Sequence, residues 1–161
     1  MLAATGIRYL PVQHDFCSQR SQEEAELVLE LVNSLLQQHY QDKQGEQHAV
    51  TLEDILVVAP YNMQVNLLKS VLPAGARVGT VDKFQGQEAQ VAIVSMATSN
   101  GDYLPRFIEF LYSKNRLNVA ISRAKCLALF IANPALMAIR CTTPEEMALV
   151  NTLCWVQEVG Q

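Results

Sequence analysis

The chain has 161 residues, which is enough for one domain with its own core and too few for two ordinary domains. Half of the residues are apolar and 17% are charged, which excludes a disordered chain. The net charge is −4, whereas an autonomous nucleic-acid-binding domain usually has a strong basic excess, so any such contact must be local or shared with a partner segment.

Several other classes are also disfavoured. No apolar run approaches the roughly 20 residues that span a membrane, and the start of the chain lacks the basic segment of a signal peptide. The four cysteines form no Cys-x-x-Cys pair, so we expect buried, reduced thiols, a cytoplasmic protein and no metal site, with a metal site or disulfides as the alternative. They are Cys17, Cys126, Cys141 and Cys154.

The first third of the chain predicts a strand, a long helix and a loop. Residues 7–12 favour a strand. Ser21 precedes Glu24 by three positions, which is the spacing of a capping box at a helix start. Apolar residues then recur at helical spacing, so we expect a helix from about 22 to 40, followed by a polar surface loop over 41–50.

The rest of the chain alternates apolar runs with helical patterns. The continuous runs at 55–59, 91–96 and 127–132 predict strands that are buried on both faces, and 77–81 predicts a shorter strand. Helices are expected after residue 64, over 113–124 and from Thr143 onward. This alternation implies βαβ units, so we predict one three-layer α/β domain over 1–161 with a mainly parallel sheet.

The helix at 113–124 carries two arginines on one flank. Arg116 and Arg123 both border its apolar face, about 10 Å apart along the axis at the helical rise per residue. Guanidinium groups match phosphate oxygens and keep their charge, so a phosphate ligand is one interpretation. Salt bridges to surface carboxylates are the alternative.

A polar turn follows the strand at 77–81 and contains one glycine. Gly86 permits a close backbone approach or a positive φ, and Glu88 can accept hydrogen bonds from sugar hydroxyls. Asp82 is expected to cap the short turn, and Phe84 is expected to anchor it in the core. By itself this turn indicates little about function.

Taken in order, three segments resemble motifs IV, V and VI of the C-terminal RecA-like domain of superfamily 1 helicases. They are Pro-Tyr-x-x-Gln from Pro60, Thr-Val-Asp-x-Phe-Gln-Gly-Gln-Glu from Thr80, and Arg-Leu-Asn-Val-Ala-x-Ser-Arg-Ala from Arg116. Within superfamily 1, these segments most resemble the branch that includes the RNA-surveillance and Okazaki-fragment-processing helicases. Residues 110–113 and 141–144 also resemble bacterial members in which a RecB-like nuclease module precedes the helicase.

The resemblance implies a nucleotide-facing set of residues. Arg123 corresponds to the arginine finger that reaches the γ-phosphate of ATP, and Arg116 would support the same helix face or a neighbouring phosphate. Glu88 corresponds to the motif V glutamate that contacts the nucleotide. Gln85 and Gly86 would lie at the surface between the two motor domains.

The resemblance also implies contacts to single-stranded nucleic acid, DNA more than RNA. Thr80 and the loop Thr98, Ser99 and Asn100 fall where family members contact the backbone of the nucleic-acid strand. Hydroxyl and amide groups there bind the phosphates without reading the base sequence. Tyr61 and Gln64 occupy the motif IV position.

The sequence lacks the motifs that bind and activate a nucleotide. There is no Gly-x-x-x-x-Gly-Lys-Ser/Thr phosphate loop and no Asp-Glu box for Mg²⁺. We therefore expect a fragment of a larger helicase, in which an N-terminal RecA-like domain holds most of the ATP and Mg²⁺ and without which this chain is inactive. The alternatives are a non-catalytic binding or scaffold domain and, with less support, a small-molecule enzyme of the doubly wound class.

Overall fold

A computed structural model describes residues 5–17, 19–84, 86–99, 119–138, 140–141 and 144–160. Its centre is a five-stranded sheet in the order β1-β7-β6-β4-β5, in which every neighbouring pair is parallel. The strands are β1 (Gly6–Pro11), β4 (Ile55–Val58), β5 (Arg77–Gly79), β6 (Ala89–Ser95) and β7 (Ala124–Ala132). The predicted parallel α/β sheet is confirmed.

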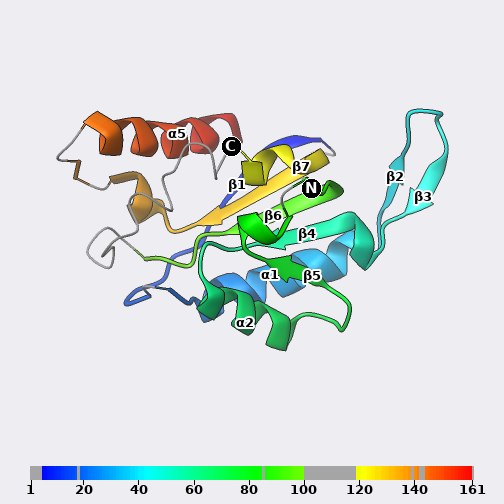
Figure 1. Cartoon of the computed structure of the whole chain (residues 1–161), viewed down its shortest axis with the longest axis horizontal. Helices are drawn as coiled ribbons and strands as arrows, with labels where there is room; N and C mark the ends of the chain where they lie inside the picture. Colours follow the sequence, from blue (N-terminus) through cyan, green and yellow to red (C-terminus); the bar gives the residue numbers. More distant parts are fainter. Residues whose placement is uncertain are drawn as a thin grey trace.

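Helices cover both faces of this sheet (Figure 1). The helices α1 (Gln22–Leu35) and α2 (Asn62–Val71) pack on one face, and α5 (Pro144–Gly160) packs on the other. Each face has its own apolar cluster, because successive strand residues point to opposite sides: Val57 and Ile93 lie under α1 and α2, whereas Val58 and Phe130 lie under α5. The three layers match the predicted RecA-like arrangement.

The start of α1 forms only half of the predicted capping box. The Ser21 hydroxyl accepts from the Glu24 backbone N–H at 3.2 Å, as expected. The Glu24 carboxylate does not return to the Ser21 N–H, which donates instead to Gln64 Oε1 at 2.8 Å. Glu24 is completely buried, on the helix face that also buries Val28. Its side chain is therefore part of the core rather than of the cap.

The end of α1 and the loop after it were predicted wrongly. The helix stops at Leu35, and the chain forms an antiparallel hairpin of β2 (His39–Gln41) and β3 (Gln47–Ala49) that projects from the domain (Figure 1). The Asp42 carboxylate accepts the backbone N–H groups of two turn residues, and Gly45 adopts a φ of 85°. This turn chemistry overrides the helical periodicity before it.

The segment before β7 also departs from the prediction. Residues 119–122 are helical, but Ala124 is the first residue of β7 and not the end of a helix. The cause is the pairing with β6, where Ala89 faces Ala124 and the Ala89 N–H donates to the Arg123 carbonyl at 3.0 Å. The rest of the predicted helix lies outside the described residues.

Three short 3₁₀ segments complete the described elements: η1 (Leu52–Asp54), η2 (Val81–Phe84) and η4 (Pro134–Ala138). In the part of the chain that the structure describes, no helix has the length and apolar character needed to cross a membrane.

Candidate functional site

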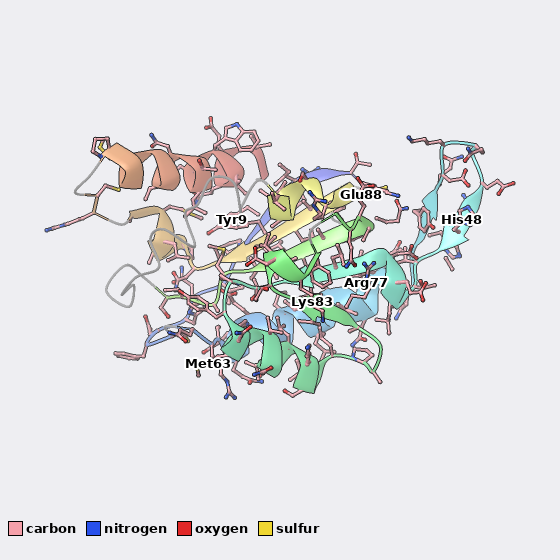
Figure 2. All side chains as sticks on the ribbon, in the orientation of Figure 1. Tyr9, His48, Met63, Arg77, Lys83 and Glu88 are labelled. Carbon is pink, nitrogen blue, oxygen red and sulfur yellow. The ribbon has the colours of Figure 1, made fainter. Side chains whose placement is uncertain are left out.

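The predicted site residues that the structure describes lie at two opposite edges of the sheet. Because all five strands are parallel, their carboxyl ends share one edge and their amino ends share the other. Glu88 and Arg123 immediately precede β6 and β7, so they lie at the amino edge. Figure 2 shows Glu88 far from Met63, which lies in the first turn of α2 after the carboxyl end of β4. Residues predicted to contact nucleic acid follow β4, β5 and β6 at the carboxyl edge.

Arg123 is half-buried at the amino edge and is held by backbone oxygens. Its Nε donates to the Val119 carbonyl at 3.3 Å, and its Nη1 donates to the Gln87 carbonyl at 3.4 Å. No carboxylate among the described residues lies within ion-pair distance of this guanidinium group. Arg123 thus keeps its charge and further N–H donors for another acceptor.

Gly86 and Glu88 lie in the same part of the amino edge. Gly86 has a φ of 78°, and a Cβ added there would meet nothing within 4 Å. Glu88 is 57% exposed, and its carboxylate lies 3.7 Å from the Lys125 ammonium group, which is similarly exposed. Such a surface pair contributes little to stability, so the Glu88 side chain is available to a ligand.

The turn that carries these residues is anchored in the core. Phe84 is buried, as predicted, and the charged groups of Arg77 and Lys83 lie 5.9 Å and 5.7 Å from its ring centroid. Arg77 also donates to Gln87 Oε1 at 2.6 Å (Figure 2 labels Arg77 and Lys83). Gln87 in turn supplies the carbonyl that Arg123 contacts. This series of contacts fixes the backbone beside Arg123.

At the carboxyl edge, Tyr61 and Thr98 are buried against each other. The Thr98 hydroxyl donates to the Tyr61 phenol oxygen at 3.2 Å. Burial raises the pKa of Tyr61 to about 12, and the bond from Thr98 offsets part of that rise. Both side chains are buried in the domain in this conformation, so their contact with a nucleic-acid strand remains a prediction.

Gln64 is completely buried and joins α1, α2 and β6. Its Oε1 accepts from the Ser21 N–H, and its Nε2 donates to the Ser21 carbonyl at 3.2 Å and to Ser95 Oγ at 3.1 Å. Both N–H donors of the amide and one acceptor site of its oxygen are used in these bonds. Gln64 therefore positions the start of α1 relative to the end of β6, and direct contact with nucleic acid is untested.

Beside Gln64 lies a buried network that the sequence analysis did not identify. The Glu24 carboxylate accepts from Ser95 Oγ at 2.6 Å and from the Ala97 N–H at 2.9 Å, and it lies 2.9 Å from His14 Nε2. His14 Nδ1 lies 2.7 Å from Ser99 Oγ. The missed signal is periodicity, since Glu24 is four residues before Val28 on the buried face of α1.

Ser99 connects this network to the loop ahead of α1. Its Oγ accepts from the Cys17 N–H at 3.0 Å, and its own N–H donates to the Cys17 carbonyl at 2.8 Å. Thr80, also predicted to bind the strand, is half-buried just after β5, and its carbonyl accepts from the Lys83 N–H. The remaining predicted site residues, Gln85, Asn100 and Arg116, lie outside the described residues.

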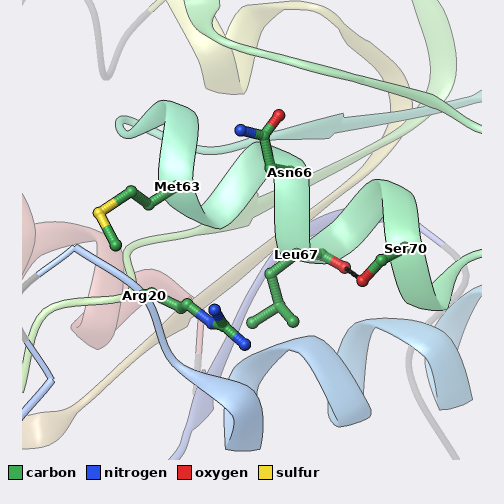
Figure 3. A pocket seen from close by; sticks show the side chains of 5 residues that line it. All are labelled: Arg20, Met63, Asn66, Leu67 and Ser70. Carbon is green, nitrogen blue, oxygen red and sulfur yellow. Dashed lines mark hydrogen bonds between the residues drawn. The ribbon is translucent and has the colours of Figure 1, made fainter.

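A hollow of about 270 Å³ opens beside the carboxyl edge, between α2 and the segment that leads into α1 (Figure 3). Figure 3 shows Arg20 entering it from that segment and Met63 from the first turn of α2. The remaining lining residues are Asn66, Leu67 and Ser70.

One group of potential metal ligands occurs among the described residues, on the β2–β3 hairpin. Ligand atoms of Asp42, Glu46 and His48 lie within 4.8 Å of one another. The Asp42 carboxylate already accepts from two backbone N–H groups and lies 2.7 Å from His48 Nε2, and the His48 contact holds the pKa of Asp42 below its usual value. These contacts account for the cluster as turn structure.

Comparison with known proteins agrees with this architecture. The AAA domain family matches residues 11–135. The chain is 40% identical over 92 residues to mouse RNA helicase Mov10l1, covering 53% of the chain and 8% of the relative. It is 30% identical over 133 residues to chicken putative helicase MOV-10, covering 71% and 13%.

A longer match is to human NFX1-type zinc finger-containing protein 1, with 31% identity over 161 residues, 92% of the chain and 8% of that protein. The chain therefore spans only 8–13% of the length of these relatives. Nothing in these comparisons tests the predicted nuclease fusion. The family match and the layered parallel fold show that the chain belongs to the AAA domain family, as a helicase-type domain of the superfamily 1 branch that includes the RNA-surveillance helicases.

Proposed function

We propose that this chain is the second motor domain of an ATP-dependent nucleic-acid helicase or translocase. In this proposal Arg123 is the arginine finger that acts on ATP held mainly by an N-terminal RecA-like domain. The observation that carries it is the state of Arg123, which is fixed by two backbone oxygens and has no carboxylate partner among the described residues. The alternative of a salt bridge between Arg123 and a surface carboxylate is not realised among the described residues.

The amino-edge residues fit a nucleotide triphosphate. Arg123 has guanidinium donors to spare, Glu88 is exposed and follows Gln87, whose carbonyl Arg123 contacts, and the space around Gly86 admits close approach. ATP with Mg²⁺ supplies the phosphoryl group and the metal charge when bound. The chain itself contributes a fixed positive charge from Arg123 and a sugar-hydroxyl acceptor from Glu88.

Electrostatic stabilisation is the chemical role of this arrangement. A guanidinium group that is already oriented stabilises negative charge that develops on transferring phosphoryl oxygens without further reorganisation. Here the anchored Phe84 turn and the Gln87 carbonyl provide that orientation. Gln85 and Arg116 are proposed to extend the same surface.

The carboxyl edge is proposed to hold the single strand through Thr80 and the loop of Thr98, Ser99 and Asn100. The separation of the two edges by the length of the sheet supports this assignment, because a motor must sense nucleotide at one surface and grip the strand at another. Relatives named as RNA helicases favour RNA, whereas the sequence analysis favours DNA, so the assay must compare both.

The test is ATP turnover by the full-length protein with saturating single-stranded RNA or DNA. Arg123→Ala is expected to lower turnover by roughly 10³- to 10⁵-fold, and Arg123→Lys is expected to restore little of it because a point charge does not replace the planar fork. Lys125→Ala, which removes a nearby surface cation, is the matched control. Normal turnover by Arg123→Ala would favour the alternative, a non-catalytic scaffold domain, and would sink the proposal.

A further inference from the structure

The loop between β1 and α1 presents an aromatic ring that the domain does not use. Phe16 is 84% exposed, the highest value among the large apolar side chains of the described residues. Its φ is 60°, in the left-handed region that non-glycine residues rarely adopt. Hydrogen bonds on either side of Phe16 support this backbone conformation.

The backbone on each side of Phe16 is fixed to the carboxyl edge. Before it, the His14 carbonyl accepts from Asn133 Nδ2 at 2.6 Å, and the His14 ring contacts Ser99 and Glu24. After it, Cys17 makes two hydrogen bonds with Ser99. The ring therefore lies between two backbone positions that are hydrogen-bonded to the carboxyl edge, one of them to Ser99.

Strain occurs at both ends of this connection. Phe16 and Ala97 are the two non-glycine residues with positive φ in the described part of the chain, and Ala97 has a φ of 67°. Ala97 lies two residues before Ser99, and its N–H donates to the Glu24 carboxylate. Backbone strain of this kind persists where the structure over-determines a conformation, and it gathers at ligand-binding surfaces.

We propose that Phe16 is a stacking platform for an unpaired base of the single strand. Exposed aromatic faces stack on bases regardless of sequence, whereas hydroxyl and amide groups hold the intervening phosphates. Phe16 is tied to the loop that contains Ser99, which the proposed function assigns to the strand backbone. Arg20, four residues further along the same loop, lies over the hollow beside α2, where it supplies a positive charge (Figure 3). This inference rests on the proposed function.

The test separates the base from the backbone. Binding of the full-length protein to a dye-labelled single strand is compared with binding to an abasic strand of equal length and charge. Phe16→Ala is expected to weaken binding to the base-bearing strand by roughly 5- to 100-fold and to change binding to the abasic strand by less than about twofold. Phe16→Trp, which keeps an aromatic ring at this position, is expected to retain the wild-type affinity for the base-bearing strand.

Two further variants control for folding and for general apolar exposure. Phe16→Gly suits the positive φ, so it removes the ring without adding backbone strain and should reproduce the loss. Trp155→Ala removes a 52% exposed aromatic from α5, on the other face of the sheet, and should leave binding unchanged.

The outcomes distinguish this inference from the proposal beneath it. Wild-type affinity of Phe16→Ala for the base-bearing strand, or equal losses on both strands, would overturn the stacking role and leave the motor assignment intact. Failure of the wild-type protein to bind any single strand would overturn both.

Discussion

The two edges of the sheet hold their polar groups in opposite states. At the carboxyl edge, Glu24, Gln64 and Ser99 are almost fully buried and are hydrogen-bonded to neighbouring elements. At the amino edge, Glu88 is exposed and Arg123 is held by two long bonds to backbone oxygens. This difference indicates that Glu24 and Gln64 hold the elements of the carboxyl edge together, whereas the amino edge leaves Glu88 and Arg123 accessible to a partner. The predictions below test that contrast in order of effect on stability.

The largest effect on stability is expected from Glu24→Ala. This change leaves Ser95 Oγ, the Ala97 N–H and the His14 ring without their buried acceptor. Each buried donor left without its acceptor costs about 1–3 kcal/mol of the free energy of unfolding. Urea unfolding of this chain measures it, with Glu30→Ala on the exposed side of α1 as the control. A loss below about 1 kcal/mol would show that the network does not stabilise the edge.

A smaller effect, confined to high pH, is expected at Tyr61. Burial raises its pKa to about 12, above the unfolded value of about 10, so the folded state disfavours the phenolate. The stability that depends on the protonated phenol is complete below pH 10 and is lost as the pH rises through 12.

The measurement compares unfolding of the wild-type chain and Tyr61→Phe across pH 8–12. The wild-type free energy of unfolding should fall relative to the variant by up to about 2 kcal/mol between pH 10 and 12. Below pH 10 the two curves should run parallel, offset by about 1 kcal/mol for the lost bond with Thr98. Parallel curves over the whole range would place Tyr61 in contact with solvent.

The smallest effect on stability is expected at the amino edge. Glu88→Gln should change the free energy of unfolding by less than about 0.5 kcal/mol, because the contact with Lys125 is a surface ion pair. Lys125→Gln should match it in unfolding. In the full-length protein only Glu88→Gln should lower ATP turnover, and equal losses from both variants would assign Glu88 to the ion pair alone.

The strands and layers were predictable because strands that are buried on both faces appear in the sequence as continuous apolar runs. The runs that became β4, β6 and β7 are continuous and apolar, as strands covered on both faces must be. The hairpin was missed because its formation depends on Asp42 and Gly45 closing a turn, while residues before it continue a helical pattern.

The candidate site residues remain predictions, but the structure shows where they lie in the fold. The motif resemblance pointed to Arg123, Glu88, Gln64 and Ser99, yet it could not reveal that the first two lie at one edge of the sheet and the last two at the other. Glu24 and His14 escaped notice because their bonds join segments about 70 to 85 residues apart, such as Glu24 with Ala97 and His14 with Ser99. Such contacts are set by the sheet topology and not by local pattern.

The most direct test of the two-edge account measures ATP turnover and nucleotide-free single-strand affinity on one preparation of full-length Arg123→Ala. Since Arg123 lies at the amino edge, we predict that turnover falls by roughly 10³-fold or more while strand affinity stays within about twofold of the wild-type value. Loss of strand affinity in parallel with turnover would contradict the separation of the two surfaces.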